Sequence, residues 1–444
     1  MRISVIGCGY LGAVHAACMA ELGHEVVGLD VDEAKIEKLS KGIAPFHEDG
    51  LPELLEKHVG NGLEFTTDPS KIADAEIHFI GVGTPQRQGH IAADMTYVDQ
   101  AIATIIEHAD TSHGTVLVAG KSTVPVGTSE GLAKRLQDSG KDFLLVWNPE
   151  FLREGYAVKD TLTPDRIVYG LPDDQAQGEK AKAMLDECYA KPLADGTPLV
   201  VANYPTAELV KVAANSFLAT KISFINAMAE LCDATGGDVT RLAEAIGHDE
   251  RIGSKFLQAG IGFGGGCLPK DIRAFMARAG ELGVGDALGF LREVDGINLR
   301  RRDAAVELAE EAVHERLVGK KIAVLGITFK PETDDLRDSP ALDIATRLWS
   351  RGAELRIYDP AAGPELRERR PDLTVPDTAE EAVKDADVVM LLTPWKEFLA
   401  LDPKELIKQV GTPNIIDGRN VLDPKAWADA GWNYYGMGRG VSAW

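Results

Sequence analysis

A glycine-rich segment that ends in a cysteine is the least ordinary stretch of this sequence, GIGFGGGCLPKDIRAF at 260–275. Five glycines in seven residues precede Cys267, and Pro269 follows at a position that helix starts favour. A helix start offers backbone N–H groups and a positive dipole end, and Lys270 adds a cation, so the setting favours a thiolate. We predict that Cys267 is a nucleophile; the alternative is a buried structural cysteine. The remaining cysteines are predicted to be structural: Cys8, Cys18, Cys188 and Cys232.

A second chemical motif lies at the start of the chain, where an apolar run meets G-x-G-x-x-G at Gly7, Gly9 and Gly12. Gly7 allows a tight turn, Gly9 lets the backbone approach a pyrophosphate, and Gly12 lets a helix pack closely on a strand. The following helix and strand close on Asp30, eighteen residues after Gly12. A carboxylate there accepts both ribose hydroxyls and repels a 2′-phosphate, so the motif predicts NAD rather than NADP.

Further strands are expected in the segments 73–85, 114–128 and 142–151. Each ends in a polar or glycine-rich turn, which is typical of a parallel sheet whose carboxyl edge binds the ligand. This topology predicts a cluster near the cofactor: Thr84, Ser122, Thr123 and Glu150.

The middle of the chain predicts one long helix at about 205–232, since it holds no glycine and no internal proline. Apolar residues fall on every face, so the helix is buried on several sides. About 28 residues would span about 42 Å, long enough for a rod that joins two domains. Lys211 and Asn215 stand four residues apart and therefore share one face.

The last third begins a second β-α-β unit at about Lys320, with a strand at 322–325 and a later strand that ends on Asp359. This unit lacks G-x-G-x-x-G and carries Lys330 and Arg337 instead, so we expect a different phosphate ligand. Arg419 adds a cation at another strand end. The expected fold is α/β, with two Rossmann-like doubly wound domains joined by a long central helix and a helical middle domain. The predicted domains are 1–202, 203–317 and 318–444.

Composition restricts the partners. The 444 residues hold 47 Lys and Arg against 69 Asp and Glu, a formal charge of −22. Such acidity argues against nucleic acid but allows small anionic ligands. The cysteines form no CxxC pair and no metal-ligand spacing, which predicts no metal and a reduced, cytoplasmic location. Glycines and His15 interrupt the N-terminal apolar run, so neither a signal peptide nor a membrane helix is expected.

Together these motifs resemble the UDP-glucose/GDP-mannose dehydrogenase family over essentially the whole chain. One departure is Gly266, where many members carry serine; this leaves the nucleophile intact and should matter little. The resemblance is carried by GCGYLG, GVGTP, KSTVPVGT, NPEFLREG, Lys211 with Asn215, RIG at 251–253, GFGGGCLPKD, TFKPETDDLRDSP and DGRNVLD.

The resemblance implies a four-electron oxidation of the C6 hydroxyl of a nucleotide-sugar to a carboxylate by two NAD⁺. Cys267 would add to the intermediate aldehyde, and the resulting thiohemiacetal would give a thioester that water hydrolyses. Lys211 would stabilise oxyanions or handle the proton, and Asn215 would hold the sugar oxygen. Asp271 would position water and Lys211. Glu150 would activate the hydrolytic water, which Thr123 shares, with Glu154 nearby.

By the same resemblance, two sets of residues bind the ligands. Arg251 would reach the substrate of a neighbouring subunit, which implies a homodimer or a higher homo-oligomer. The cofactor residues would be Gly7, Gly9, Tyr10, Leu11, Gly12, Asp30, Lys35, Thr84, Pro85, Ser122, Thr123, Glu154, Lys270 and Arg337. The substrate residues would be Phe151, Leu152, Arg153, Glu154, Lys211, Asn215, Arg251, Gln258, Gly260, Phe263, Gly264, Lys330 and Arg419.

Two other functions stay open. A two-electron β-hydroxyacid dehydrogenase would use the lysine and asparagine but needs neither Cys267 nor a second Rossmann-like domain. A non-catalytic NAD-binding regulator would need no convergent set of reactive side chains. Within the leading hypothesis the nucleotide can be UDP, TDP or GDP. The sugar can be glucose, which we favour, mannose or an N-acetylhexosamine.

Overall fold

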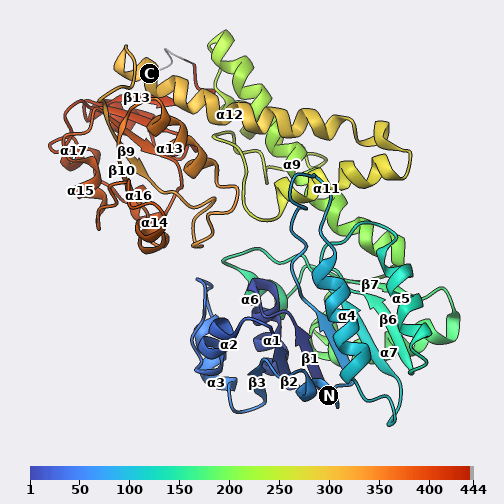
Figure 1. The fold of residues 1–444 in the computed structure, drawn as a ribbon. Coiled ribbons are helices and arrows are strands. Elements are labelled where there is room, and N and C mark those ends of the chain that lie inside the picture. Colours follow the sequence, from blue (N-terminus) through green and yellow to red (C-terminus); the bar gives the residue numbers. More distant parts are fainter. Residues whose placement is uncertain (441–444) are drawn as a thin grey trace. The chain divides into compact units, whose positions relative to one another are not determined.

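The structure is a computed structural model that describes residues 1–440. The last residues of the predicted third domain, 441–444, lie outside the described residues. The chain forms two compact units, which we call unit 1 (1–214 and 273–285) and unit 2 (215–272 and the chain from 286 onward). Figure 1 shows the elements of both units. The boundaries predicted after residues 202 and 317 stay predictions.

Unit 1 is built on an eight-stranded sheet in the order β3-β2-β1-β4-β5-β6-β7-β8. The predicted parallel strands are present, but β6 and β7 pair antiparallel. The sequence analysis did not identify β3, β7 or β8. The strands are β1 (Arg2–Ile6), β2 (Glu25–Leu29), β3 (Leu63–Thr66), β4 (Ile77–Ile80), β5 (Val116–Gly120), β6 (Phe143–Trp147), β7 (Ile167–Leu171) and β8 (Leu199–Asn203).

Both faces of this sheet are buried under helices. Alternate strand residues point to opposite sides, so β1 contributes side chains to two apolar cores. Ile3 and Val5 of β1 join one apolar core, which includes residues of α1, α3 and α7. Ile6 joins a second core with residues of α4 and α5. The helical segments are α1 (Tyr10–Glu21), α2 (Glu33–Ser40), α3 (Leu51–His58), η1 (Pro69–Ile72), α4 (Thr96–His108), α5 (Thr128–Asp138), α6 (Ala157–Leu162), α7 (Gln175–Cys188) and α8 (Ala190–Ala194).

Unit 2 contains a five-stranded, fully parallel sheet in the order β10-β9-β11-β12-β13. This confirms the second β-α-β unit, and Ser339 caps α13 by accepting a hydrogen bond from Leu342 N. The strands are β9 (Lys321–Leu325), β10 (Glu354–Tyr358), β11 (Val388–Leu391), β12 (Asn414–Asp417) and β13 (Asn433–Gly436). The helices around this sheet are α13 (Pro340–Ser350), α14 (Gly363–Arg369), α15 (Ala379–Val383), α16 (Lys396–Leu399), α17 (Pro403–Leu406) and α18 (Pro424–Asp429).

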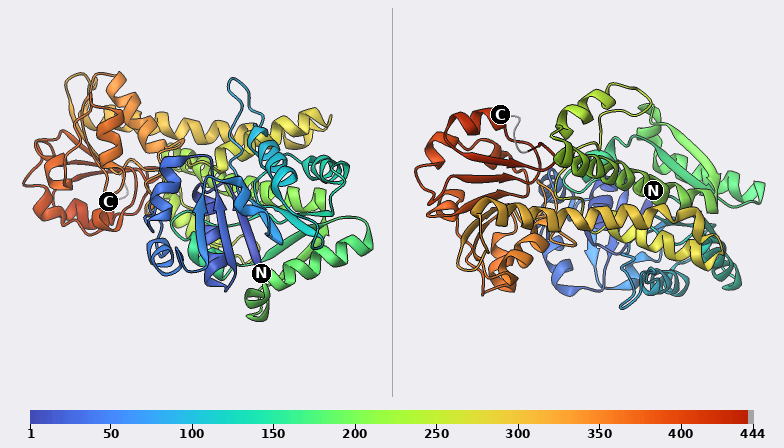
Figure 2. Two further views of the ribbon diagram at one scale, coloured as in Figure 1. Left: turned by 60° about the horizontal axis from the view of Figure 1, so that its bottom comes forward. Right: turned by 90° about the horizontal axis from the view of Figure 1, so that it is seen from above.

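The predicted long helix is α9 (Tyr204–Thr235), and its 32 residues exceed the expected length. The next residue, Gly236, has a φ of 77°, the left-handed conformation that ends many helices. In unit 2, α12 (Phe290–Val313) runs beside α9, where Ser223 Oγ donates to Val294 O over 2.7 Å (Figure 2). The remaining helical segments are α10 (Val239–Gly247), α11 (Leu268–Glu281) and η2 (Gly285–Leu288). No helix within residues 1–440 is long and apolar enough to cross a membrane.

Candidate active site

The glycine turn after β1 has the geometry that the motif predicts. Gly7 has a φ of 90°, and a Cβ atom on it would lie 2.7 Å from the Val82 side chain. A Cβ atom on Gly12 would lie 1.7 Å from Gly7 O, so only glycine fits there. A Cβ atom on Gly9 would meet no atom within 4 Å. Gly7 and Gly12 therefore shape the turn, while Gly9 leaves open space in which a pyrophosphate can approach the backbone.

Asp30 lies beside this turn, directly after β2. Its Oδ2 accepts a hydrogen bond from Cys8 N over 2.7 Å. Lys35 Nζ lies 3.1 Å from the same oxygen, so these two predicted cofactor residues form an ion pair. This arrangement fits a carboxylate that binds ribose hydroxyls at the end of the second strand.

Tyr10 and Leu11 begin the helix that follows the turn. The Tyr10 hydroxyl donates to the Glu48 carboxylate and accepts a hydrogen bond from Gly155 N over 2.7 Å. Glu48 is buried and also accepts from Ala157 N over 2.6 Å. The Tyr10 side chain thus ties the glycine turn to the start of α6, and its role toward the cofactor stays a prediction.

The carboxyl edge of the sheet brings together the predicted polar residues. Thr84 Oγ1 donates to Thr123 O over 2.7 Å. Ser122 Oγ donates to Val82 O over 2.6 Å, in the segment that leads to Thr84 and Pro85. These bonds join the turn after β4 to the turn after β5, as parallel topology predicts.

Glu150 and Lys211, two predicted catalytic residues, form an ion pair in unit 1. Lys211 Nζ lies 3.0 Å from Glu150 Oε1, and their side chains are only 8% and 14% exposed. The other Glu150 oxygen accepts a hydrogen bond from Leu152 N over 2.7 Å. A carboxylate beside an ammonium can accept a proton next to a group that stabilises an oxyanion. The sequence analysis identified both residues but gave no sign of their pairing.

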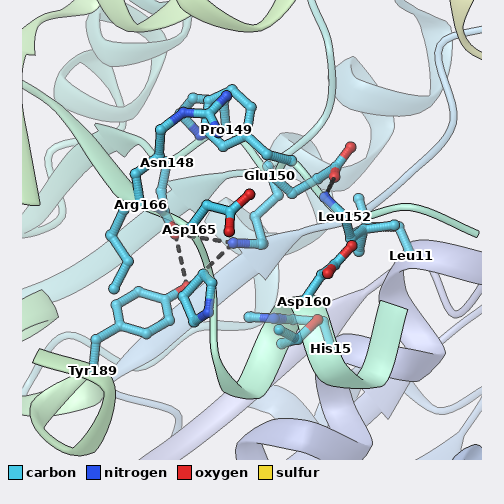
Figure 3. A pocket seen from close by; sticks show the side chains of 15 residues that line it. Leu11, His15, Asn148, Pro149, Glu150, Leu152, Asp160, Asp165, Arg166 and Tyr189 are labelled. Carbon is cyan, nitrogen blue, oxygen red and sulfur yellow. Dashed lines mark hydrogen bonds between the residues drawn. The ribbon is translucent and has the colours of Figure 1, made fainter. Parts of the chain in front are cut away.

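A cavity adjoins Glu150 (Figure 3). Most of its polar residues were not predicted from the sequence, among them Lys121, Asn148 and Tyr189. Lys121 Nζ donates to Asn148 Oδ1 over 3.0 Å and to Tyr189 Oη over 3.2 Å. One signal was present in the sequence, because Lys121 is a charged residue directly after a buried strand.

Cys267 is the exposed cysteine, and the other four are buried, as predicted. It directly precedes α11, and Asp271 N donates to Cys267 O over 2.9 Å in the first helical turn. By contrast, burial raises the pKa of the Cys18 and Cys188 thiols to about 12. Accessibility and position at a helix start therefore single out Cys267 among the five.

The glycines before Cys267 pack closely against their neighbours, and Gly262 and Gly265 also have positive φ values of 92° and 85°. A Cβ atom on Gly262 would lie 2.4 Å from Asn298 Oδ1, which accepts a hydrogen bond from Phe263 N over 2.7 Å. Cβ atoms elsewhere in the segment would meet the following neighbours: on Gly260, Gly418 O at 2.4 Å; on Gly264, Asp338 O at 2.2 Å; on Gly265, the Phe329 ring at 2.7 Å; on Gly266, the Arg337 guanidinium at 2.6 Å. The segment holds Cys267 in a fixed place because each glycine contacts a different part of unit 2.

Asp271 and Asn215 lie together in unit 2. Asn215 Nδ2 donates to Asp271 Oδ2 over 2.7 Å, and Lys270 Nζ lies 2.8 Å from Asp271 Oδ1. Both Asn215 and Asp271 are buried. The amide that is predicted to hold the sugar oxygen is therefore oriented by the carboxylate one turn after Cys267. The predicted action of Asp271 on Lys211 stays a prediction.

Arg419 stabilises the glycine segment through hydrogen bonds to backbone carbonyls. Its guanidinium donates to Leu392 O, Gly262 O and Phe329 O over 2.8, 2.8 and 3.3 Å. Burial lowers the pKa of this guanidinium to about 10. Lys330 Nζ lies 5.3 Å from the Phe329 ring, so both predicted phosphate-binding cations belong to one region of unit 2.

Other predicted substrate or cofactor residues have protein partners or lie at the surface. Arg153 pairs with Asp160, and Arg337 pairs with Asp335, at 2.7 and 2.6 Å. Gln258 is exposed, as is Arg251, which pairs with Asp249 at 2.7 Å. The ligand roles of these residues, and that of Glu154, stay predictions. Residues 1–440 contain no group of three His, Cys, Asp or Glu side chains that could hold a metal ion.

A glycine turn with an aspartate at the end of the second strand, a lysine–glutamate pair, and a second parallel sheet in the unit that holds the exposed cysteine are the features of an NAD-binding dehydrogenase with two Rossmann-like domains. Comparison with known proteins gives the family. Its NAD binding domain matches residues 1–192, its central domain 205–300 and its UDP binding domain 323–424. The chain belongs to the UDP-glucose/GDP-mannose dehydrogenase family and is an NAD-dependent oxidoreductase.

Similar proteins match along the full length. The UDP-glucose 6-dehydrogenase of Rhizobium meliloti strain 1021 is 41% identical, over 99% of this chain and 100% of that protein. A UDP-glucose dehydrogenase structure from Pyrobaculum islandicum is 37% identical, with a TM-score of 0.89 over 98% of this chain and 97% of that chain. A UDP-D-ManNAc dehydrogenase structure from Pyrococcus horikoshii is 29% identical, with a TM-score of 0.85 over 100% of both chains.

Proposed function

We propose that this chain oxidises the C6 hydroxyl of UDP-glucose to the carboxylate of UDP-glucuronate, with two NADH formed per sugar. The observation that carries the proposal is the exposed Cys267, held at the start of α11 by a tightly packed glycine segment. A covalent nucleophile suits four-electron oxidation, because it retains the aldehyde and turns it into a thiohemiacetal that can lose a second hydride. Full-length similarity to proteins named UDP-glucose 6-dehydrogenase supports the choice of sugar.

NAD⁺, held by the glycine turn of unit 1, would supply the hydride acceptor for each of the two oxidations. In the first oxidation the proton of the C6 hydroxyl passes to the water that Asp271 positions, and Lys211 stabilises the negative charge that develops on oxygen. The Cys267 thiolate then adds to the aldehyde carbon. Asn215, oriented by Asp271, holds the sugar oxygen during this addition.

Hydrolysis completes the reaction. Glu150 takes a proton from water as the water oxygen bonds to the thioester carbon, and Thr123 shares that water. The C–S bond then breaks, and Cys267 leaves as the thiolate. The 3.0 Å contact between Lys211 and Glu150 supports this assignment, since one group stabilises the oxyanion and the other accepts the proton.

In this proposal, unit 2 binds the nucleotide end of the substrate. Lys330 and Arg419 supply positive charge to the diphosphate despite the net charge of −22. We further propose that the enzyme is cytoplasmic and is at least a homodimer, in which the exposed Arg251 reaches the partner's substrate.

A panel of UDP-, TDP- and GDP-sugars, with NADH absorbance as the readout, tests this function. The proposal expects the highest kcat/KM with UDP-glucose and two NADH per sugar, with no free aldehyde. A UDP-N-acetylhexosamine preference would change the sugar and leave the chemistry intact. One NADH per sugar would instead favour a two-electron dehydrogenase.

A further inference from the structure

Unit 1 buries a cation that the proposed mechanism has not used. Lys121 is only 7% exposed, and its Nζ donates to two neutral acceptors, Asn148 Oδ1 and Tyr189 Oη. The Phe79 and Tyr189 rings lie 5.5 and 5.7 Å from the nitrogen. Burying an ammonium is costly unless it is well compensated, and these partners leave its charge in place. Because its burial is costly, Lys121 is a candidate for a functional role.

Lys121 and Glu150 line the same cavity. The cavity volume is about 60 Å³, and about 10–15 Å³ on this measure holds one water molecule. His15 also lines the cavity, and it is 1% exposed with neither ring nitrogen hydrogen-bonded within residues 1–440. Since buried polar groups are satisfied by protein or water, the cavity is a place for ordered water.

Lys121 also joins the two loops that carry the proposed hydrolytic groups. It directly precedes Ser122 and Thr123, whereas its acceptor Asn148 lies two residues before Glu150. The 3.0 Å bond from Lys121 to Asn148 therefore ties the loop after β5 to the loop after β6. Asn148 Nδ2 in turn donates to Val168 O over 2.9 Å, which fixes the amide orientation.

Charge couples Lys121 to the general base. Burial lowers the pKa of Lys121 to about 8, and the negative charge of Glu150 opposes that shift. Lys211 also pairs with Glu150, but in the proposed mechanism it must serve the substrate oxyanion as well. Lys121 has no such second task.

We propose that Lys121 is a positioning residue for thioester hydrolysis. Its bond to Asn148 holds the loop of Glu150 beside the loop of Thr123, while water in the adjoining cavity carries away the proton that Glu150 accepts. The inference rests on the proposed function. In this step the water oxygen bonds to the acyl carbon, one water proton passes to Glu150, and the C–S bond to Cys267 breaks. The charged or titratable side chains that face the cavity are His15, Lys121, Glu150, Asp160, Asp165, Arg166 and Tyr189.

Lys121→Met, which keeps the length and removes the charge, tests the inference. The matched control is Lys134→Met, because Lys134 is an exposed lysine on α5 of the same unit. We expect Lys121→Met to form its first NADH at close to the native rate. Steady-state turnover should fall by about tenfold or more, since general-base contributions reach about 10²–10⁴-fold. Acid-quenched samples should then accumulate the sugar acyl adduct on Cys267, visible as an intact-mass increase.

The two phases of NADH formation separate positioning from packing. Misplacement of the base should slow thioester hydrolysis alone, so Lys121→Met should show a native first phase and a slow steady state, whereas a general loss of packing would slow both phases. Lys121→Arg keeps a cation and should restore part of the rate. Tyr189→Phe removes one acceptor of Lys121 and should slow hydrolysis in the same direction, even where Lys121→Met fails to fold.

Native turnover with no adduct in Lys121→Met would overturn the inference. Where Lys121→Met does not fold, the same result in Tyr189→Phe would overturn it. Failure of the proposed function is distinguishable from this result. In that case the native enzyme itself would form one NADH per sugar and no covalent adduct, whatever residue stands at position 121.

Discussion

The sheets of units 1 and 2 share the same first turn. In unit 1, Gly7 N donates to Leu29 O, and in unit 2, Gly326 N donates to Tyr358 O, both over 2.8 Å. The two glycines have φ values of 90° and 87°. The residue after each glycine donates its N–H to the aspartate that follows the second strand, over 2.7 Å in both units. Two Rossmann-like units thus begin with the same local hydrogen bonds.

They diverge two residues after the glycine. Unit 1 has Gly9 there, open on its Cβ side, and α1 begins at the next residue. Unit 2 has Thr328, which is fully buried and whose carbonyl accepts a hydrogen bond from Thr393 Oγ1 over 2.6 Å. In unit 2 the next helix begins only at Pro340. The shared topology is therefore not sufficient for dinucleotide binding. The open space at Gly9 and the early start of α1 distinguish unit 1 from unit 2.

The aspartates have diverged as well. In unit 1, Asp30 binds Cys8 N and pairs with Lys35 at the edge of the site. In unit 2, Asp359 is 3% exposed, and its carboxylate accepts from Thr328 N and Trp395 Nε1 in addition to Ile327 N. The carboxylate that is predicted to bind the cofactor in one unit corresponds to a structural carboxylate in the other.

The largest expected effect comes from the nucleophile that only unit 2 supplies. Cys267→Ala should lower acid formation by about 10³-fold or more, since loss of a covalent nucleophile has effects of at least this size. NAD⁺ and nucleotide-sugar should both still bind, because an exposed side chain is lost. Calorimetric titration and quenched product analysis measure the two quantities.

Alkylation supplies the control for that variant. Cys267 should be the one thiol of the five that iodoacetamide modifies quickly, and nucleotide-sugar should protect it. Two NADH per sugar from Cys267→Ala would contradict the covalent mechanism.

The second prediction compares the loss of Asp359 with the loss of Asp30. Asp359→Ala leaves several buried N–H donors without an acceptor and should lower the free energy of unfolding by about 3 kcal/mol, at about 1–3 kcal/mol per orphaned group. Asp30→Ala should cost less stability and should weaken NAD⁺ binding more than NADP⁺ binding, by about tenfold. Thermal unfolding and cofactor titration of both variants give the comparison. Equal loss of stability in the two variants would remove the distinction.

Motifs of neighbouring residues made much of the fold and of the candidate site predictable. The glycine turn, Asp30 and the cysteine at a helix start each follow from residues close together in the chain. Lys121 was missed because its partners Asn148 and Tyr189 lie 27 and 68 residues away. The pairing of Lys211 with Glu150 and the packing of each glycine in the Cys267 segment are likewise long-range. The antiparallel β6–β7 pair gave no local signal, because a buried strand looks the same in either direction.

The third prediction separates two cations of unit 2. Lys330→Ala and Arg419→Ala should each raise the KM for nucleotide-sugar by about tenfold, the loss of one charge-assisted contact of about 1.5 kcal/mol. NAD⁺ affinity should stay nearly unchanged. Arg419→Ala should also lower the melting temperature, because its guanidinium bonds three backbone carbonyls. Native kinetics in Arg419→Ala would assign this residue to structure alone.

The smallest effect is expected at Gly266, next to the nucleophile. A Cβ atom there would meet the Arg337 guanidinium at 2.6 Å, but this is the far end of a flexible side chain that is 63% exposed. The guanidinium can move, so Gly266→Ser should change kcat by less than about threefold and leave the alkylation rate of Cys267 nearly unchanged. Gly264→Ala is the contrasting variant, because its Cβ atom would lie 2.2 Å from the backbone oxygen of Asp338. Overpacking against backbone costs about 1–3 kcal/mol, so this variant should be less stable and should react more slowly with iodoacetamide at Cys267. If Gly266→Ser instead slowed alkylation as much as Gly264→Ala, the Arg337 guanidinium would be part of the setting that activates the thiolate.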